Sequence, residues 1–462
     1  MRLRQGYGAQ VRSGPAPERG PLDVTHSTTR RDFIRSVGAG AVAAAGTQGT
    51  PAAAAAPRQA AAPARSRVLG ANDRINVGFV GCGGRMNSHI TRVMNRHASQ
   101  ADVQAVAVND IWDKRKEAAR EKTGVEASAV YHDYRELCAR PDIDAVVVSS
   151  PDHWHFAHTM AALENGKDVY LEKPMTYTVD EARKIADYVT ANGRVLQVGS
   201  QYTSLDHFHK ARKAIADGLI GQVVWASGGF GRNSTRRGNE WNYRIDPDAN
   251  PSNLDWKAFI GNAPKRDWDP ARYFRWRKYW DYSGGIATDL FYHTVAPILM
   301  AAGPEFPVRV AASGGIYVQK DREVPDTFFM NVDYPSWTMQ LACSVASGKG
   351  APLVFHGSEG SILVAEDSES FANTEIVIVP DRDYKDDFVK KTGREELRIE
   401  VKPFVRGEHP HMDNFLEAVR TRQKPNLDAD LGYKAMAAID GGVTSYRKGR
   451  IVGFDAKSGK LS

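Results

Sequence analysis

Several features that define other classes of protein are scarce in this sequence of 462 residues. Its three cysteines, Cys82, Cys138 and Cys343, are too few and too far apart for a disulfide framework or a cysteine-rich metal site. No apolar run approaches the roughly 20 residues that a membrane-spanning helix needs. Seven arginines and three acids in residues 1–56 give +4 of the formal charge of +6, so the rest of the chain is nearly neutral. That balance argues against the clustered basic face of a nucleic-acid-binding protein.

What is present is typical of a globular protein. Apolar residues make up 42% of the chain and aromatic residues 9%. At 462 residues the chain exceeds the length at which one hydrophobic core usually stops growing. We therefore expect two domains.

The amino-terminal segment has the pattern of an export signal. Residues 29–35 (TRRDFIR) precede a weakly apolar stretch over residues 37–46 and alanines that suit cleavage near Ala56. The pattern resembles a twin-arginine signal, which predicts a signal peptide over residues 1–56, a linker over 57–73 and a mature protein free in the periplasm without a membrane anchor. The alternative is a disordered tail with a chance pair of arginines.

From Arg74 onward, strand and helix patterns alternate. A strand at 75–80, a turn at 81–84, a helix to about Arg96 and a strand at 103–108 form one βαβ unit. The turn reads Gly81-Cys82-Gly83-Gly84. Gly81 permits a tight turn, Gly83 lets backbone N–H groups approach a pyrophosphate at the positive end of the helix, and Gly84 allows further close approach. Met86 occupies the third glycine position of this fingerprint, which weakens the motif.

An acid follows the second strand at the position that binds the ribose of NAD. Asp110 lies 24 positions after Met86, and its charge would repel a 2′-phosphate. Arg115 could instead accommodate that phosphate. The sequence therefore favours NAD as the cofactor and leaves NADP possible.

The chain is organised around residues 168–175 (DVYLEKPM). Residues 169–171 predict a buried strand, so Glu172-Lys173-Pro174 should emerge at its carboxyl end, where open α/β sheets bind their ligands. The X-Pro bond can turn the backbone there in cis, which would fix the direction of Lys173. Alone, this motif would more often be a strand end with a solvated lysine, so the rest of the chain must decide.

Four motifs together resemble the Gfo/Idh/MocA oxidoreductases. They are the Gly-x-Gly-Gly turn, Ser-Pro-Asp-His-Trp-His at 150–155, Gly-Lys-Asp-Val-Tyr-Leu-Glu-Lys-Pro at 166–174 and Gly-Gly-x-x-x-Asp-x-x-x-His at 284–293. They occur in the family order across residues 74–455.

The resemblance implies an α/β chain. A Rossmann domain at 74–200 is joined to an α+β domain at 201–455 with an open-faced, mainly antiparallel sheet, and a tail follows at 456–462. It also implies NAD(P) between the domains, sugars or polyols as substrates, and a homo-oligomer formed through the sheet face. Lys173 would act at the substrate oxygen. The cofactor contacts expected around the nicotinamide are Pro151, Trp154, His155, Glu172 and Lys173. His155 could alternatively cap or pack its helix.

A long insertion at residues 232–282 holds five of the nine tryptophans. A loop of this length is usually functional or a lid. Aromatic faces pack against sugar rings, so we expect Trp280, Asp281 and Tyr282 near the substrate. Most of the insertion's other aromatic residues could simply pack it onto the sheet.

A helix predicted at 286–301 carries Asp289 and His293 four positions apart, on one face. Oxidation of a hydroxyl needs a base with a pKa near neutrality, and a neighbouring carboxylate can orient it. We expect His293 to be the base and Asp289 its partner. His409 and His411 lack further ligands, so no metal is assigned. Other elements are predicted as strands at 308–318, 328–334, 338–344, 353–356, 361–364 and 376–379, and as helices at 208–216, 411–421 and 431–446.

The expected activity is hydride transfer between a nicotinamide and a carbinol carbon of a sugar or polyol. An alternative is a redox-neutral glycosidase that uses bound NAD for transient oxidation and elimination. A third reading is a sugar-binding protein without catalysis on the same scaffold, which the presence of Lys173, Asp289 and His293 disfavours.

Overall fold

The computed structural model describes residues 74–366, 371–405 and 409–462. The expected export signal at 1–56 and the linker at 57–73 lie outside the described residues. Within the described ranges, no helix combines the length and the apolar character needed to cross a bilayer.

The first sheet has six parallel strands in the order β3-β2-β1-β4-β5-β6, the arrangement of a Rossmann domain. Its central strands are continuous apolar runs because helices cover both of their faces. The peptide bond between Lys173 and Pro174, just after β5, is cis, as the sequence allowed. The strands are β1 (Ile75–Val80), β2 (Val103–Asn109), β3 (Val130–Tyr131), β4 (Ala145–Val148), β5 (Asp168–Glu172) and β6 (Leu196–Gly199).

Helices pack on both faces of this sheet. One core joins Phe79 and Tyr170 to apolar residues of α1, α2 and α11, including Phe415. Helix α11 returns from the far end of the chain to cover apolar surface that α1 and α2 leave open, so the expected 201–455 segment does not form a separate unit throughout. The helices are α1 (Gly84–Gln100), α2 (Asp113–Thr123) and α11 (Pro410–Thr421) on one face, and α3 (Tyr134–Cys138), α4 (His155–Glu164) and α5 (Val179–Asn192) on the other.

The second sheet has ten strands in the order β14-β13-β12-β11-β7-β10-β9-β8-β15-β16. Its pairs are antiparallel except β7 with β10, which run parallel. The six predicted strands are present with small shifts, while β16 lies in the expected tail. The strands are β7 (Val223–Gly231), β8 (Arg309–Gly315), β9 (Thr327–Asp333), β10 (Thr338–Ser344), β11 (Leu353–Gly357), β12 (Gly360–Ala365), β13 (Glu375–Pro380), β14 (Leu397–Glu400), β15 (Val452–Asp455) and β16 (Lys460–Leu461).

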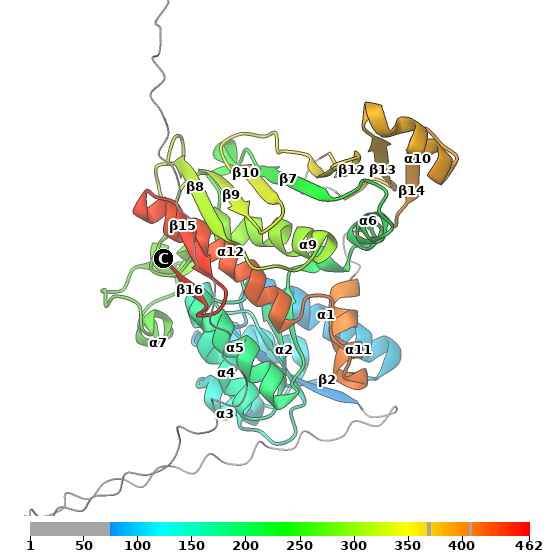
Figure 1. Cartoon of the computed structure of the whole chain (residues 1–462). Coiled ribbons are helices and arrows are strands. Elements are labelled where there is room, and N and C mark those ends of the chain that lie inside the picture. The colour runs from blue at the N-terminus through cyan, green and yellow to red at the C-terminus, as the bar shows by residue number, and fades with distance from the viewer. Residues whose placement is uncertain (1–73, 367–370, 406–408) are drawn as a thin grey trace, which may run out of the picture. The chain divides into compact units, whose positions relative to one another are not determined.

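One face of the second sheet is covered by helices. Helix α12 packs against β8 and also against α5, so it connects the two sheets (Figure 1). Successive side chains of a strand point alternately to this covered face and to the opposite, open face. In β9, Phe328 and Met330 are buried and Phe329 is 47% exposed. The helices of this part are α6 (Asp206–Ala216), a π-helical turn at Ala287–Phe291, α9 (Tyr292–Ala302), α10 (Lys385–Thr392) and α12 (Ala429–Lys448).

The insertion at 232–282 is largely irregular and contains α7 (Trp256–Ile260) and α8 (Pro270–Phe274). Most of its aromatic residues form a separate core together with Trp112, which follows β2, whereas Trp241 belongs to the larger core that includes the second sheet. The insertion therefore packs onto the carboxyl ends of the first sheet, and it also contacts the second domain, where Lys278 pairs with Asp321 and Ser234 Oγ donates to the Val345 carbonyl.

Candidate active site

A cavity of about 1340 Å³ lies over the carboxyl ends of the strands of the first sheet. Loops after β1, β2, β4 and β5, the insertion and α9 all contribute to its walls. Ten of the predicted site residues line it: Gly81, Gly83, Gly84, Asp110, Arg115, Pro151, Trp154, Glu172, Lys173 and His293. The structure thus gathers residues that are far apart in the sequence around one space.

The glycine-rich turn is shaped to receive an anion. Gly81 has a φ of +82°, and a Cβ there would lie 2.9 Å from the backbone nitrogen of Ser150. Helix α1 begins at Gly84 with no side-chain cap and no acid in its first turn, so its first N–H groups and positive end remain available for a phosphate. Met86 is fully buried in the core, so the departure from the fingerprint does not obstruct the turn.

Asp110 holds this turn in place. It is 4% exposed, and its carboxylate accepts hydrogen bonds from the backbone N–H groups of Cys82 at 2.8 Å and Trp112 at 2.9 Å. Arg115 donates from Nη1 to the Tyr273 hydroxyl at 2.9 Å, and its guanidinium lies over the rings of Trp112 and Tyr273. Because Arg115 is engaged in these contacts, the acid at the end of β2 is left to define the ribose position, which favours NAD over NADP.

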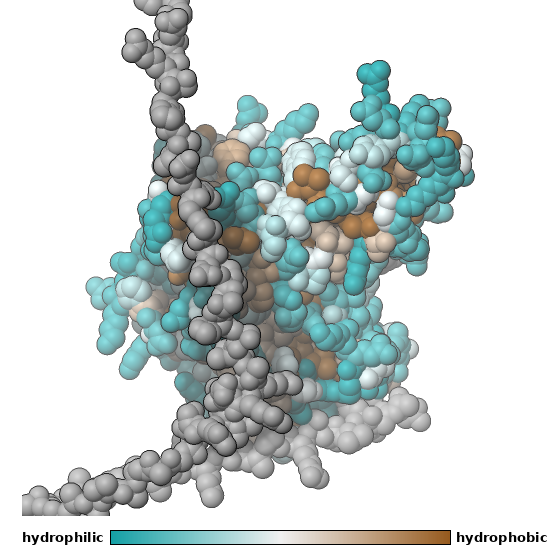
Figure 2. Space-filling view, in the orientation of Figure 1, coloured by the Kyte–Doolittle hydropathy of each residue, from teal (hydrophilic) through white to brown (hydrophobic). Residues whose placement is uncertain are grey.

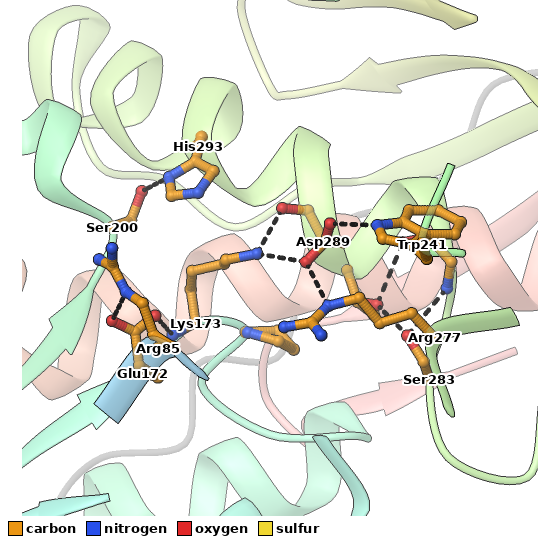
Figure 3. A network of polar contacts seen from close by, with 12 residues as sticks. Arg85, Glu172, Lys173, Ser200, Trp241, Arg277, Ser283, Asp289 and His293 are labelled. Carbon is orange, nitrogen blue, oxygen red and sulfur yellow. Dashed lines mark hydrogen bonds and ion pairs between the residues drawn. The ribbon is translucent and has the colours of Figure 1, made fainter. Parts of the chain in front are cut away.

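Lys173 projects from the end of β5 toward Asp289. Its Nζ donates to Asp289 Oδ1 at 2.6 Å and to the Asp289 carbonyl oxygen at 2.6 Å (Figure 3). Asp289 lies in the π-helical turn at Ala287–Phe291. Such turns interrupt the regular helical hydrogen-bond pattern and are frequent at functional sites. The lysine is therefore fixed by two oxygens of one residue.

The insertion supplies two further partners of Asp289. Arg277 donates from Nε to Oδ1 at 2.9 Å, and the indole Nε1 of Trp241 donates to Oδ2 at 2.8 Å. Burial alone would raise the pKa of Asp289, but Lys173 and Arg277 hold it well below its usual range. Asp289 is therefore a carboxylate at neutral pH.

His293 does not pair with Asp289, which corrects the expectation from their spacing. Its Nδ1 lies 3.0 Å from the hydroxyl oxygen of Ser200, at the end of β6, while the carboxylate of Asp289 is occupied by Lys173, Arg277 and Trp241. Burial and the nearby Lys173 charge lower the pKa of His293 well below its ordinary value. The imidazole is therefore neutral and able to accept a proton, with Ser200 as its orienting partner.

Glu172 positions a second cation at the cavity. Its Oε1 accepts from Arg85 Nε at 2.6 Å and lies 2.7 Å from His89 Nε2. Although burial opposes its ionisation, the Arg85 guanidinium and His89 keep the pKa of Glu172 well below its usual range. Arg85 lies in the first turn of α1 and lines the cavity, so Glu172 holds a guanidinium beside the glycine-rich turn.

His155 is a structural residue, which corrects its assignment as a cofactor contact. It is 1% exposed, with Nδ1 2.6 Å from the Pro174 carbonyl oxygen and Nε2 2.8 Å from the Ser150 carbonyl oxygen. Both ring nitrogens are thereby occupied inside the protein. His158, one helical turn later, lines the cavity and stacks on Trp154 at 4.9 Å. The motif located the right helix but the wrong face.

The three residues of the insertion that we expected near the substrate do not line the cavity. Trp280 packs beside Tyr446, Asp281 pairs with arginines of the insertion, and Tyr282 is fully buried in the aromatic core. Sequence reasoning could not place them because the insertion has no regular periodicity. Its cavity-lining residues near Lys173 are instead Tyr243, Trp276 and Arg277.

The fold and this cavity define a Rossmann-type dinucleotide-binding protein with a second, sheet-based domain. Two family models match the chain. One, described as an oxidoreductase family with an NAD-binding Rossmann fold, matches residues 75–200, and the other, described as the C-terminal α/β domain of that oxidoreductase family, matches residues 261–454. The chain belongs to the Gfo/Idh/MocA family of oxidoreductases.

Curated relatives match part of the chain. Inositol 2-dehydrogenase of Rubrobacter xylanophilus is 31% identical over 206 residues, which are 44% of this chain and 53% of that protein. Inositol 2-dehydrogenase of Burkholderia cenocepacia is 34% identical over 148 residues, which are 32% of this chain and 43% of that protein. The chain thus spans about half the length of the curated relatives it matches.

Solved structures share the fold over most of both chains. Levoglucosan dehydrogenase in complex with NADH and levoglucosan has a TM-score of 0.61 at 19% identity, covering 82% of this chain and 99% of that chain. Aldose-aldose oxidoreductase from Caulobacter crescentus, complexed with glycerol, has a TM-score of 0.60 at 20% identity, covering 82% of this chain and all of that chain. At these identities the likeness establishes the fold.

Proposed function

We propose that this protein is an NAD-dependent oxidoreductase that transfers a hydride between a nicotinamide and the CH–OH carbon of a sugar or polyol. The observation that carries the proposal is the arrangement of Lys173 and His293 on one cavity. The Nζ of Lys173 is fixed by Oδ1 and the carbonyl oxygen of Asp289. Its charge is also close enough to His293 to lower the pKa of that imidazole.

The residues at the glycine-rich turn fit the cofactor. The uncapped start of α1 would hold the pyrophosphate, and Asp110 lies where it would meet the adenosine ribose. Arg85 would add positive charge beside the phosphates. The nicotinamide, when bound, supplies the hydride acceptor.

The chain's own residues would handle the proton and the charge on oxygen. As the substrate carbon loses its hydride, the hydroxyl proton passes to Nε2 of His293, because Nδ1 is held by Ser200. The Lys173 ammonium stabilises the negative charge that develops on the same oxygen. Asp289 acts through Lys173 and not through His293, since it positions the ammonium and balances its charge.

The substrate class is supported by the relatives and by the cavity. The curated relatives are named as inositol dehydrogenases, and solved neighbours were crystallised with levoglucosan, glycerol or L-sorbose. Trp276 and Tyr243 provide aromatic surface near Lys173, and Arg277 can donate to hydroxyl groups. The dehydrogenase names favour net hydride transfer over the redox-neutral glycosidase.

A screen of inositols, anhydrosugars and disaccharides with purified protein and NAD would test the proposal. Both the absorbance of the reduced nicotinamide and cleavage of glycosidic bonds should be recorded. Formation of NADH without cleavage, amounting to about one equivalent per protein where the nucleotide stays bound, is the expected result. Cleavage without accumulating NADH would instead support the eliminating glycosidase, and tight binding without either would support a sugar-binding protein.

We also propose export to the periplasm by the twin-arginine route. Support comes from residues 29–35 (TRRDFIR) and the alanine-rich stretch that follows them. Fractionation of cells that express the full chain, with and without an Arg30→Lys and Arg31→Lys double substitution, would test it. Retention of the double variant in the cytoplasm is expected, and equal export of both proteins would contradict the proposal.

The open face of the second sheet supports a homo-oligomer. Trp225 and Phe329 are exposed on it at 37% and 47%, beside small residues of β7 and β10. Figure 2 shows apolar and near-neutral side chains over the region where Figure 1 places these strands. Exposed aromatic residues on an open sheet face are typical of subunit contacts. A monomeric mass in solution would contradict this proposal.

A further inference from the structure

The insertion at 232–282 is joined to the loop that follows β2 by backbone pairing. Trp112 and Leu254 form an antiparallel bridge, in which the N–H of Asp113 donates to the Asn253 carbonyl at 3.0 Å and the N–H of Asp255 donates to the Ile111 carbonyl at 3.0 Å. Backbone pairing fixes the position of one segment on the other without relying on side chains. The insertion is therefore built onto the edge of the first domain.

Polar side chains also meet at the same junction. Lys114 Nζ lies 2.7 Å from Asp246 and 3.1 Å from Asp248, both in the insertion. His132 Nε2, at the end of β3, lies 3.1 Å from Asp255. These contacts link the ends of both β2 and β3 to the insertion.

A hydrophobic core closes the junction. Trp112 is 4% exposed and packs edge-on against Tyr273 and Phe274, and Leu254 is 1% exposed in the same core. Burial of the leucine side chain stabilises the junction. The side chain of Leu254 is not among the residues that line the cavity.

The junction lies at the carboxyl ends of β2 and β3. In a Rossmann domain the carboxyl ends of β2 and β3 flank the adenosine half of the dinucleotide, because the pyrophosphate lies at the turn after β1. The cavity there is lined from the first domain by Asp110 and Trp112 and from the insertion by Asp246, Lys257 and Tyr273. Trp112 also has a buried indole Nε1 without a hydrogen-bond partner among the described residues.

We propose that the insertion forms the outer wall of the adenosine half of the cofactor site and retains the adenine dinucleotide there. This inference rests on the proposed function. It adds that the insertion, whose residues 232–260 are matched by neither family model, completes the binding site. A nucleotide between the two walls contacts both. It leaves only when the junction around Leu254 loosens.

Leu254→Ala tests this role without touching the cavity, and Leu353→Ala in β11 is the matched control, since Leu353 is also 1% exposed but lies in the second sheet. Full-length proteins are loaded with NADH and freed of excess nucleotide. The loss of bound NADH fluorescence is then followed after addition of a large excess of NAD. Circular dichroism confirms that each variant is folded, and Leu254→Val replaces Leu254→Ala if that variant is not.

Release from Leu254→Ala should be at least ~10-fold faster than from the wild type, because a leucine truncation of this kind removes much of the packing that holds the junction. Release from Leu353→Ala should equal that of the wild type. Equal rates for the wild type and the folded Leu254 variant would overturn the inference while leaving the proposed function intact. A wild-type protein that binds no NADH would overturn the proposed function itself.

Discussion

Replacing Lys173 with methionine tests the proposed chemistry most directly. The substitution keeps a long apolar stem and removes the ammonium that faces the substrate oxygen. A preorganised donor at a developing oxyanion is worth ~100- to 1000-fold in turnover, or about 3–4 kcal/mol. We expect a loss of that size in kcat for Lys173→Met, with NADH affinity unchanged because the glycine-rich turn is untouched.

The structure also sets the expected cost in stability. Removing one partner of a buried ion pair usually costs about 3–5 kcal/mol because the other charge is left unpaired. Here Asp289 keeps the hydrogen bonds from Arg277 and Trp241, so its carboxylate remains paired. We therefore expect a cost of about 1.5–3 kcal/mol in urea unfolding, that of losing hydrogen bonds to a charged group.

Lys167→Met is the matched control. Lys167 is 5% exposed just before β5, and its Nζ donates to the Ile143 carbonyl at 3.0 Å, away from the cavity. Its loss should lower the free energy of unfolding without lowering the turnover of the folded enzyme. Wild-type turnover in Lys173→Met, with NADH binding intact, would refute the role assigned to Lys173.

Three other perturbations address the base, the insertion and the buried histidines. His293→Asn should remove the acid limb of the pH profile of kcat/KM. We expect this limb below pH ~6.5 because burial and Lys173 lower the pKa of His293. A profile identical to that of the wild type would assign the limb to another group. Trp241→Phe should lower turnover ~5-fold by removing one hydrogen bond to Asp289, whereas Trp256→Phe, which loses a similar bond to the Arg266 carbonyl, should not. Burial lowers the pKa to about 4 for each of three histidines: His89, His155 and His411. The native state then binds fewer protons than the unfolded state between pH ~6.5 and ~4, so the free energy of unfolding should fall with acid by up to ~1.4 kcal/mol per pH unit for each histidine. Equal unfolding free energies at pH 7 and pH 5 would contradict this.

Most of the first domain could be predicted because its physical signals are local. A parallel strand buried on both faces is a continuous apolar run, as in residues 145–148 and 169–171, and the glycine-rich turn follows directly from the need for a left-handed residue at Gly81. Lys173 could be placed at the cleft for the same reason, since a strand end determines where the next residues emerge.

The partners of Asp289 could not be predicted because they depend on contacts between distant segments. The spacing of Asp289 and His293 indicated one helical face, but Lys173, Arg277 and Trp241 reach the carboxylate from β5 and from the insertion. A π-helical turn, which has no clear sequence pattern, also lies at that position. In the same way, the motif pointed to His155, and only the packing of α4 decides that His158 lines the cavity instead.

The proposed export and the wall formed by the insertion lead to one kinetic expectation. The twin-arginine route carries folded proteins, and the periplasm has no ready supply of NAD, so a nucleotide that dissociated there would be lost. A protein loaded in the cytoplasm, with the adenosine half of its site closed at the junction around Leu254, would keep one nucleotide through many turnovers. Each turnover must then end with that nucleotide restored in place by a second carbonyl substrate. Double-reciprocal plots for the two substrates should therefore be parallel, and periplasmic protein should release near-stoichiometric NAD(H) on denaturation. Intersecting plots together with a requirement for added NAD would show that the nucleotide exchanges in every cycle.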